Sequence, residues 1–131
     1  MFTGIVQSLV AVTGVEEERD LSRIELDLGE LAQGIELGAS VAVNGTCLTV
    51  TRTSNTGGVC FDIIKETLDT TNLGTLTAGS LVNVERSFKV GDEVGGHIVS
   101  GHVTATASLC DLRHEGHDRV LTFALDAQWL R

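Results

Sequence analysis

Hydrophobic and polar positions alternate along the first part of the chain in the manner of β-strands. Residues 2–15 alternate loosely and are rich in β-branched side chains, which is typical of a strand. Residues 24–28 alternate strictly, which predicts a half-buried strand. The charged run 16–20 between them is predicted to be a solvated loop. Residues 31–37 are long enough for one helical turn.

The same pattern continues in short pieces separated by turn signals. Strands are expected at residues 40–43, 47–50, 59–64 and 81–85, with turns at Asn44–Gly45 and residues 55–58. Residues 65–73 suggest a short helix, and residues 86–96 read as a glycine-containing linker. Many short strands, closely spaced turns, little helix and no proline indicate a closed β-barrel.

A weak internal repeat extends this picture. Residues 2–6 align with residues 99–103 at an offset of 97, and the same offset places the apolar positions of residues 24–28 on those of residues 121–125. We therefore predict an all-β fold, in which a six-stranded closed Greek-key-like barrel with a short helix (residues 1–97) precedes an incomplete second barrel repeat (residues 98–131). Part of a barrel cannot bury its own apolar face or pair its own edges. The chain is thus expected to be a shortened form, or one whose tail pairs elsewhere.

Composition narrows the classes of function. The net charge of −9 without a basic stripe argues against nucleic acid, because phosphate contacts dominate such binding. No apolar run approaches the roughly 18 residues of a membrane span, and the N-terminus lacks the pattern of a signal peptide. The three cysteines form no Cys-x-x-Cys pair, so a cytoplasmic protein with reduced thiols is the simplest interpretation.

Several side chains could carry chemistry. Cys47 follows a hairpin turn in an apolar strand, so it is either a plain core residue or a thiol facing a ligand pocket. Cys60 and Cys110 are interpreted as core. His97 and His102 lie in a glycine-rich segment and suit proton transfer near neutral pH.

Metal binding is not favoured by the sequence. His114 and His117 provide the only pair near zinc-ligand spacing, and they lie in a polar turn where solvated histidines are the simpler interpretation. Residues 62–67 place polar groups after a strand. They suit an ordinary helix start or, alternatively, contacts to the edge of a polar heterocycle.

Taken together, the motifs are similar to one known family. The stretches that carry the resemblance are Met1–Gln7 (MFTGIVQ), Asn44–Val50 (NGTCLTV), Phe61–Leu68 (FDIIKETL), Thr71–Gly74 (TNLG), Val82–Arg86 (VNVER) and Gly91–Val103 (GDEVGGHIVSGHV). They occur in order over nearly the whole chain, and the sequence resembles the riboflavin synthase family (alpha chain).

The resemblance implies two similar barrels in tandem and a homotrimer, whose active sites form between the N-terminal barrel of one subunit and the C-terminal barrel of another. The implied reaction is the dismutation of two 6,7-dimethyl-8-ribityllumazine molecules into riboflavin and 5-amino-6-ribitylamino-pyrimidinedione. It makes the chain a transferase that needs neither metal nor cofactor. The chain alone is expected to form a dimer or higher oligomer with little activity.

The resemblance also implies a set of site residues. His102 is expected in proton transfer and Cys47 beside the reacting ring. The expected substrate-binding residues are Gly4, Ile5, Val6, Ser40, Cys47, Leu48, Thr49, Asp62, Ile63, Ile64, Lys65, Glu66, Thr67, Gly101, His102 and Val103.

A non-catalytic alternative has the same fold. The related lumazine proteins bind the same heterocycles without turning them over, and they lack both histidines and the intact Asn-Gly-x-Cys-Leu-Thr stretch. This chain retains both features, which favours the synthase over a lumazine- or flavin-binding protein.

Overall fold

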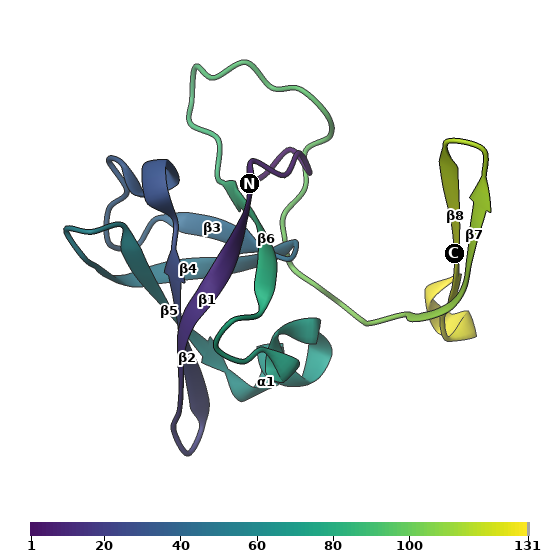
Figure 1. Cartoon of the computed structure of the whole chain (residues 1–131), viewed down its shortest axis with the longest axis horizontal. Helices are drawn as coiled ribbons and strands as arrows, with labels where there is room; N and C mark the ends of the chain where they lie inside the picture. The colour runs from purple at the N-terminus through teal and green to yellow at the C-terminus, as the bar shows by residue number, and fades with distance from the viewer. Residues whose placement is uncertain (131) are drawn as a thin grey trace.

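The computed structural model describes residues 1–130 and consists mainly of short strands (Figure 1). The elements are β1 (Ser8–Glu17), β2 (Leu21–Asp27), η1 (Gly29–Ala32), β3 (Ser40–Val43), β4 (Thr46–Thr53), β5 (Gly58–Ile64), α1 (Lys65–Thr70), η2 (Asn72–Thr75), β6 (Leu81–Arg86), β7 (Ser108–Glu115), β8 (Asp118–Ala124) and η3 (Ala127–Trp129).

Strands β1 to β6 form a closed antiparallel barrel in the order β1-β2-β5-β4-β3-β6. The last strand, β6, closes it by pairing with β1 on one side and β3 on the other. A separate two-stranded sheet, β7-β8, follows. The prediction of a six-stranded closed barrel with one short helix and an incomplete second sheet is confirmed.

Alternate residues of each barrel strand fill the interior. The buried core cluster comprises Val10, Val12, Ile24, Leu26, Leu28, Val41, Val43, Leu48, Val50, Val59, Phe61, Ile63, Leu73, Val82 and Val84. The β3-β4 turn is tight because Asn44 and Gly45 both have positive φ, at 48° and 82°, as a two-residue hairpin turn requires. This hairpin places Ser40 opposite Thr49 and Ala42 opposite Cys47.

Three expectations about local structure were wrong. Residues 3–7 are irregular, and β1 begins at Ser8 and runs on through Glu16 and Glu17, because hydrogen bonds to β2 continue past the last apolar position. The turn expected within residues 31–37 is a 3₁₀ turn over Gly29–Ala32. Cys110 is exposed rather than core, because nothing packs on either face of β7.

The β7-β8 hairpin stands apart from the barrel at the end of an extended segment (Figure 1). Its register matches that of β1-β2: Val12 pairs with Leu26, and Leu109 pairs with Phe123, each 97 residues further on. A register irregularity follows both pairs, between Val12 and Gly14 in β1 and between Leu109 and Asp111 in β7. Val12 and Leu26 are buried in the barrel, whereas Leu109 and Phe123 are 53% and 56% exposed.

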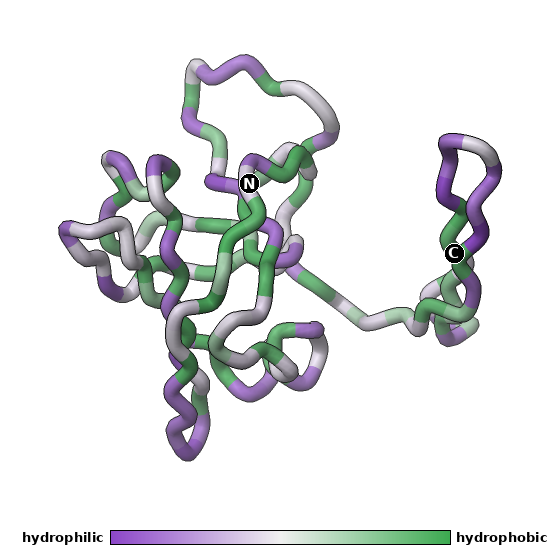
Figure 2. Tube along the Cα trace, in the orientation of Figure 1, coloured by the Kyte–Doolittle hydropathy of each residue, from purple (hydrophilic) through white to green (hydrophobic). Residues whose placement is uncertain are grey.

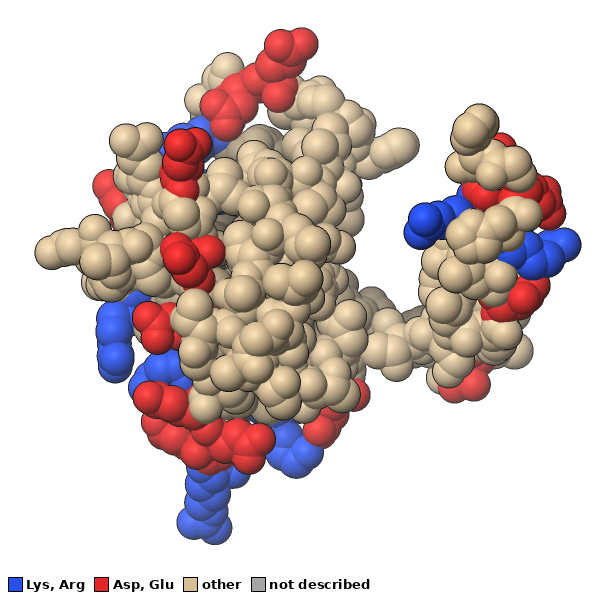
Figure 3. Space-filling model, viewed as in Figure 1, with Lys and Arg blue, Asp and Glu red and all other residues tan. Residues whose placement is uncertain are grey.

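Polar and charged residues mark the outside of the molecule. The β1-β2 turn is hydrophilic, whereas green apolar stretches run through the barrel strands (Figure 2). In the same view acidic side chains gather around this turn, which contains Glu18 and Asp20 (Figure 3). Within residues 1–130 no helix is long and apolar enough to cross a membrane.

Candidate ligand site on the outer face of the barrel

A row of outward-facing positions crosses β4, β3 and β6. Ala42 pairs with Cys47 on one side and with Glu85 on the other. Outward positions are normally wet in a small barrel, yet Ala42 and Glu85 are buried and Cys47 is half-buried. Something outside the barrel therefore covers this row.

The cover consists of two chain segments that pair with each other. Phe2 forms an antiparallel bridge with Val99, with N–H···O distances of 2.8 and 2.9 Å between the two residues. The His97 N–H also donates to the Thr3 carbonyl at 3.0 Å. Phe2 is only 2% exposed although it lies outside the barrel's core cluster. The chain start and residues 97–101 thus form one small layer over the outer face.

Gly101 joins this layer to β4. Its carbonyl accepts a hydrogen bond from the Cys47 N–H at 2.8 Å, and its φ is +78°. A Cβ on Gly101 would lie 2.9 Å from Cys47 Cβ and 3.0 Å from Phe2 Cε2. The Phe2 ring and the Cys47 side chain therefore converge on one point that only a glycine leaves open.

A second polar row lies beside the first. Thr49 on β4 pairs with Ser40 on β3, and the neighbouring strand β5 carries Asp62. Arg23 on β2 binds the Asp62 carboxylate through Nε at 2.6 Å and Nη2 at 2.9 Å, and the Thr51 hydroxyl donates to the same carboxylate at 3.4 Å. Asp62 already has protein partners on both oxygens.

These partners alter the acidity of Asp62. The hydrogen bonds from Arg23 are the main cause that lowers the pKa of Asp62 below its ordinary value, against the opposing effect of burial. The same pair raises the pKa of Arg23. Asp62 is accordingly a carboxylate acceptor at neutral pH.

The remaining predicted residues divide by the direction of their side chains. Leu48 and Ile63 are buried in the core, so they can offer a ligand only backbone groups. Gly4, Ile5, Val6, Thr49, Ile64, Lys65, Glu66, His102 and Val103 are exposed, and Ser40, Cys47, Asp62, Thr67 and Gly101 are half-buried. Lys65 pairs with Asp69 one helical turn along α1 at 2.7 Å.

Of the two predicted proton-transfer histidines, His97 lies within the covering layer and His102 directly follows it. His97 and His102 are exposed, and the His102 N–H donates to the Ser100 hydroxyl at 3.2 Å. Residues 3–5 at the chain start form the same kind of turn as residues 100–102: the Ile5 N–H donates to the Thr3 hydroxyl at 3.2 Å, and Gly4 has φ +79°.

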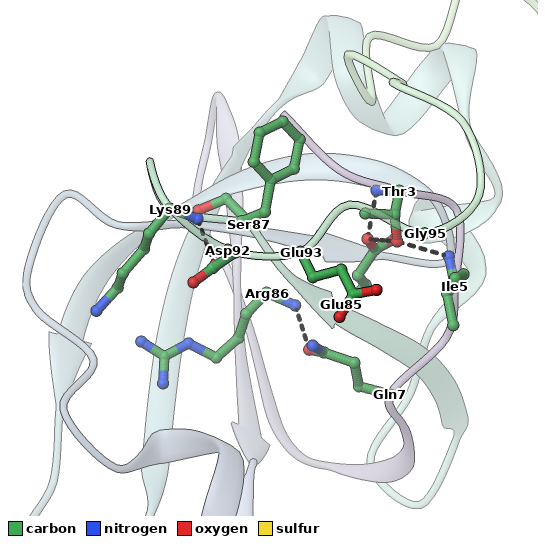
Figure 4. A pocket seen from close by; sticks show the side chains of 11 residues that line it. Thr3, Ile5, Gln7, Glu85, Arg86, Ser87, Lys89, Asp92, Glu93 and Gly95 are labelled. Atoms are coloured by element: carbon green, nitrogen blue, oxygen red, sulfur yellow. Dashed lines mark hydrogen bonds between the residues drawn. The ribbon is translucent and has the colours of Figure 1, made fainter.

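A pocket of about 480 Å³ opens beside the covering layer (Figure 4). It is lined by Thr3, Ile5 and Gln7 but not by Gly4 or Val6, and its far wall is the segment that follows β6. The charged groups around it are mixed in sign: Glu85, Arg86, Lys89, Asp92 and Glu93. Of the predicted site residues only Ile5 reaches it. Within residues 1–130, no three His, Cys, Asp or Glu side chains are grouped to hold a metal ion.

Sequence reasoning missed three residues that build this region: Phe2, Arg23 and Glu85. Phe2 and Glu85 lie in stretches that carried the family resemblance, but alternation assigns Glu85 to solvent, since Val82 and Val84 face the core. The cover over Glu85 comes from the other end of the barrel sequence. Arg23 carried no signal beyond its outward position opposite Asp62 in the β2-β5 pair.

Comparison with known proteins identifies the family of the chain. The lumazine-binding domain family matches residues 3–87. The chain is 43% identical to the riboflavin synthase of Escherichia coli (strain K12), covering all of this chain and 62% of that protein. It is 40% identical to the riboflavin synthase of Mycobacterium tuberculosis (strain ATCC 25618 / H37Rv), covering all of this chain and 65% of that protein. The resemblance seen in the sequence is confirmed, and the chain spans just under two thirds of the length of these relatives.

Solved structures agree on the fold. The crystal structure of LumP complexed with riboflavin superposes with a TM-score of 0.86 at 26% identity, over 99% of this chain and 70% of that chain. The complex of LumP with 6,7-dimethyl-8-(1'-D-ribityl) lumazine gives a TM-score of 0.84 at 26% identity, over 97% of this chain and 70% of that chain.

Proposed function

From the premise that this chain belongs to the lumazine-binding domain family, we propose that it binds 6,7-dimethyl-8-ribityllumazine and riboflavin on the outer face of its barrel. Residues 1–97 form the binding barrel, and residues 98–131 begin a second repeat. In the whole protein the bound lumazine is a substrate of riboflavin synthesis.

One observation carries this proposal. Segments far apart in the sequence, namely residues 2–6, residues 97–101 and the Cys47 end of β4, meet on one outer face beside the polar row of Ser40 and Thr49. This combination gives an apolar surface for a flat ring and hydroxyl groups for a polar chain, which is what a ribityl heterocycle needs. The relatives named above are riboflavin synthases and a LumP–riboflavin complex.

The proposed reaction is a dismutation. One lumazine gives a four-carbon unit to a second, which becomes riboflavin, while the donor leaves as 5-amino-6-ribitylamino-pyrimidinedione. The 7-methyl group of the lumazine is acidic because its carbanion delocalises into the ring, so one positioned base suffices to remove the proton. Holding two flat molecules face to face supplies much of the remaining reduction of the activation barrier, up to ~7–11 kcal/mol for ideal orientation. His102 is proposed in proton transfer and Cys47 beside the reacting ring.

The second repeat and the assembly belong to the same proposal. The common register of β1-β2 and β7-β8, with its matching irregularity, supports an internal repeat of barrel units. We propose a homotrimer for the whole protein, with each site completed by the neighbouring subunit's second barrel.

A fluorescence titration tests the binding step. The purified chain is expected to quench riboflavin and lumazine fluorescence saturably, with about one ligand per barrel. Ovalbumin at the same concentration serves as the blank for nonspecific quenching. Failure to saturate with ligand up to ~50 µM would refute the proposed function.

A binding protein without turnover is the second candidate, favoured by the close superposition on LumP bound to riboflavin. The two candidates separate when the native full-length protein is incubated with the lumazine and riboflavin formation is followed by absorbance. Saturable binding with riboflavin production supports the synthase, and saturable binding without it supports the binder.

A further inference from the structure

Glu85 is the one acidic side chain of the barrel that is buried on its outside. It is 7% exposed, although it points away from the core on β6. It lies in the same cross-strand row as Ala42 and Cys47. Burying a carboxylate is costly unless its oxygens find strong partners.

The partners of Glu85 all come from the start of the chain. One carboxylate oxygen accepts from the Thr3 N–H and, at 2.7 Å, from the Thr3 hydroxyl (Figure 4). The other oxygen accepts from the Gly4 N–H at 3.0 Å. Within residues 1–130 no cationic side chain forms an ion pair with Glu85. The carboxylate is therefore held by N–H and O–H donors, and hydrogen bonds to an ionised acceptor are stronger than those between neutral groups.

The hydrogen bonds of Glu85 also hold residues beyond Thr3 and Gly4 in place. The Thr3 hydroxyl also accepts the Ile5 N–H at 3.2 Å, and the Thr3 carbonyl accepts the His97 N–H. Phe2, immediately before Thr3, pairs with Val99. One side chain on β6 thus anchors the chain start directly and residues 97–101 through it.

We propose that Glu85 is a positioning residue, which holds Phe2–Gly4 and residues 97–101 against Cys47 and so shapes the ligand-binding face. The anchoring of the chain start is independent of the proposed function, whereas the effect on ligand binding rests on it. A carboxylate suits this role because both of its oxygens only accept, and three donors converge on them. In Glu85→Gln the amide NH₂ would face an N–H donor, so part of the anchor is lost. In Glu85→Ala all of it is lost.

The first experiment needs no ligand. In a Cys110→Ser background, modification of Cys47 by an aromatic disulfide reagent is followed for the parent, Glu85→Gln, Glu85→Ala and the control Glu17→Gln, whose carboxylate is exposed. Loss of charge-assisted hydrogen bonds should raise the rate at Cys47 roughly tenfold or more in Glu85→Ala, with Glu85→Gln in between. Amide exchange at Thr3 and Gly4 should accelerate in the same order.

The second experiment adds riboflavin and the lumazine. Glu85→Ala should weaken both affinities by roughly tenfold while Tm and the far-UV circular dichroism of the barrel stay near the parent values, because the closed sheet does not depend on residues 2–4. A merely structural role would instead lower Tm together with affinity. Glu85→Gln should partly rescue affinity.

The outcomes are separable. An unchanged rate at Cys47 in Glu85→Ala, or in Glu85→Gln if the alanine variant does not fold, overturns the anchor whatever the ligand does. Faster modification with unchanged affinity overturns the positioning role. If the parent chain binds neither ligand, the proposed function fails, while the thiol and amide measurements still decide whether Glu85 holds the chain start.

Discussion

The three cysteines occupy three different environments, and these environments set their reactivity. Burial is the main cause that raises the pKa of the Cys60 thiol, while Cys110 is exposed on β7 and Cys47 is half-buried under the covering layer. Because the thiolate is the nucleophile, we expect a thiol reagent to modify Cys110 first, Cys47 next and Cys60 only on unfolding. Peptide mass mapping of a time course checks this order. Early labelling of Cys60, which faces outward between Val59 and Phe61, would contradict this order.

The Arg23–Asp62 pair should make stability depend on pH. Since Arg23 lowers the folded-state pKa of Asp62, its stabilisation is present above the unfolded-state pKa of ~3.9 and is lost as the pH falls through the folded-state value. Arg23→Gln should therefore be less stable than the parent at pH 6, with the difference shrinking below about pH 4. Urea unfolding at several pH values measures it. Lys65→Gln, which breaks the exposed pair with Asp69, is the control and should show a smaller effect.

Cys47 and His102 are the two side chains proposed to act in the reaction. In the native full-length protein, Cys47→Ala and His102→Gln should each lower kcat by ~10²-fold or less, with lumazine affinity little changed, because orientation of the two rings remains. Steady-state kinetics with the lumazine checks this. Full activity in both variants would assign the chemistry to orientation and solvent water.

Contacts between distant segments were harder to predict from the sequence than the motifs themselves. Cys47 and Gly101 were named from motifs, and the structure brings their backbones together. Phe2 and Glu85 were missed because alternation within one strand reports only which side a residue faces. It says nothing of what another segment lays over that side. Arg23 was missed for the same reason, since its partner is 39 residues away.

At the scale of elements, the docking of residues 97–101 on the barrel depends on Gly101. Gly101→Ala would combine an unfavourable φ of +78° with contacts of 2.9–3.0 Å to Cys47 and Phe2. We expect the segment to detach, with faster proteolysis within residues 97–103 and a cost of about 1–3 kcal/mol for its docking. Gly38→Ala is the matched control, since Gly38 has φ +82° with no atom near the added Cβ. Equal effects in both variants would reduce the role of Gly101 to backbone strain.

Strand existence followed from alternation, whereas strand boundaries did not. The β1 strand begins at Ser8 because residues 2–6 pair with nothing in the barrel sheet and are held instead by Glu85 and Val99. It continues to Glu17 because an exposed two-stranded arm needs backbone pairing and no apolar face. Both features depend on partners distant in sequence.

At the scale of the whole molecule, the β7-β8 hairpin exposes apolar side chains that another chain could cover. Leu121 and Phe123 occupy positions equivalent to the buried Ile24 and Leu26, yet they are 48% and 56% exposed. We expect this chain to form at least a dimer through these strands. Light scattering should show it, and Leu121→Lys with Phe123→Lys should shift the chain toward the monomer. Glu115→Lys, on the same hairpin but outside the apolar face, is the charge control. A monodisperse parent monomer would contradict this prediction.

The closing strand also dictates when the fold can form during synthesis. Ser8 pairs with Val84, and Val41 pairs with Arg86, so the ribosome must release β6 before either edge of the sheet has its neighbour. Until then the nascent chain carries an open sheet, and such long-range pairing is slow. The chain start must wait longer, because Glu85 arrives with β6 and Val99 arrives later still. Barrel closure therefore precedes assembly of the ligand-binding face as the chain folds during synthesis.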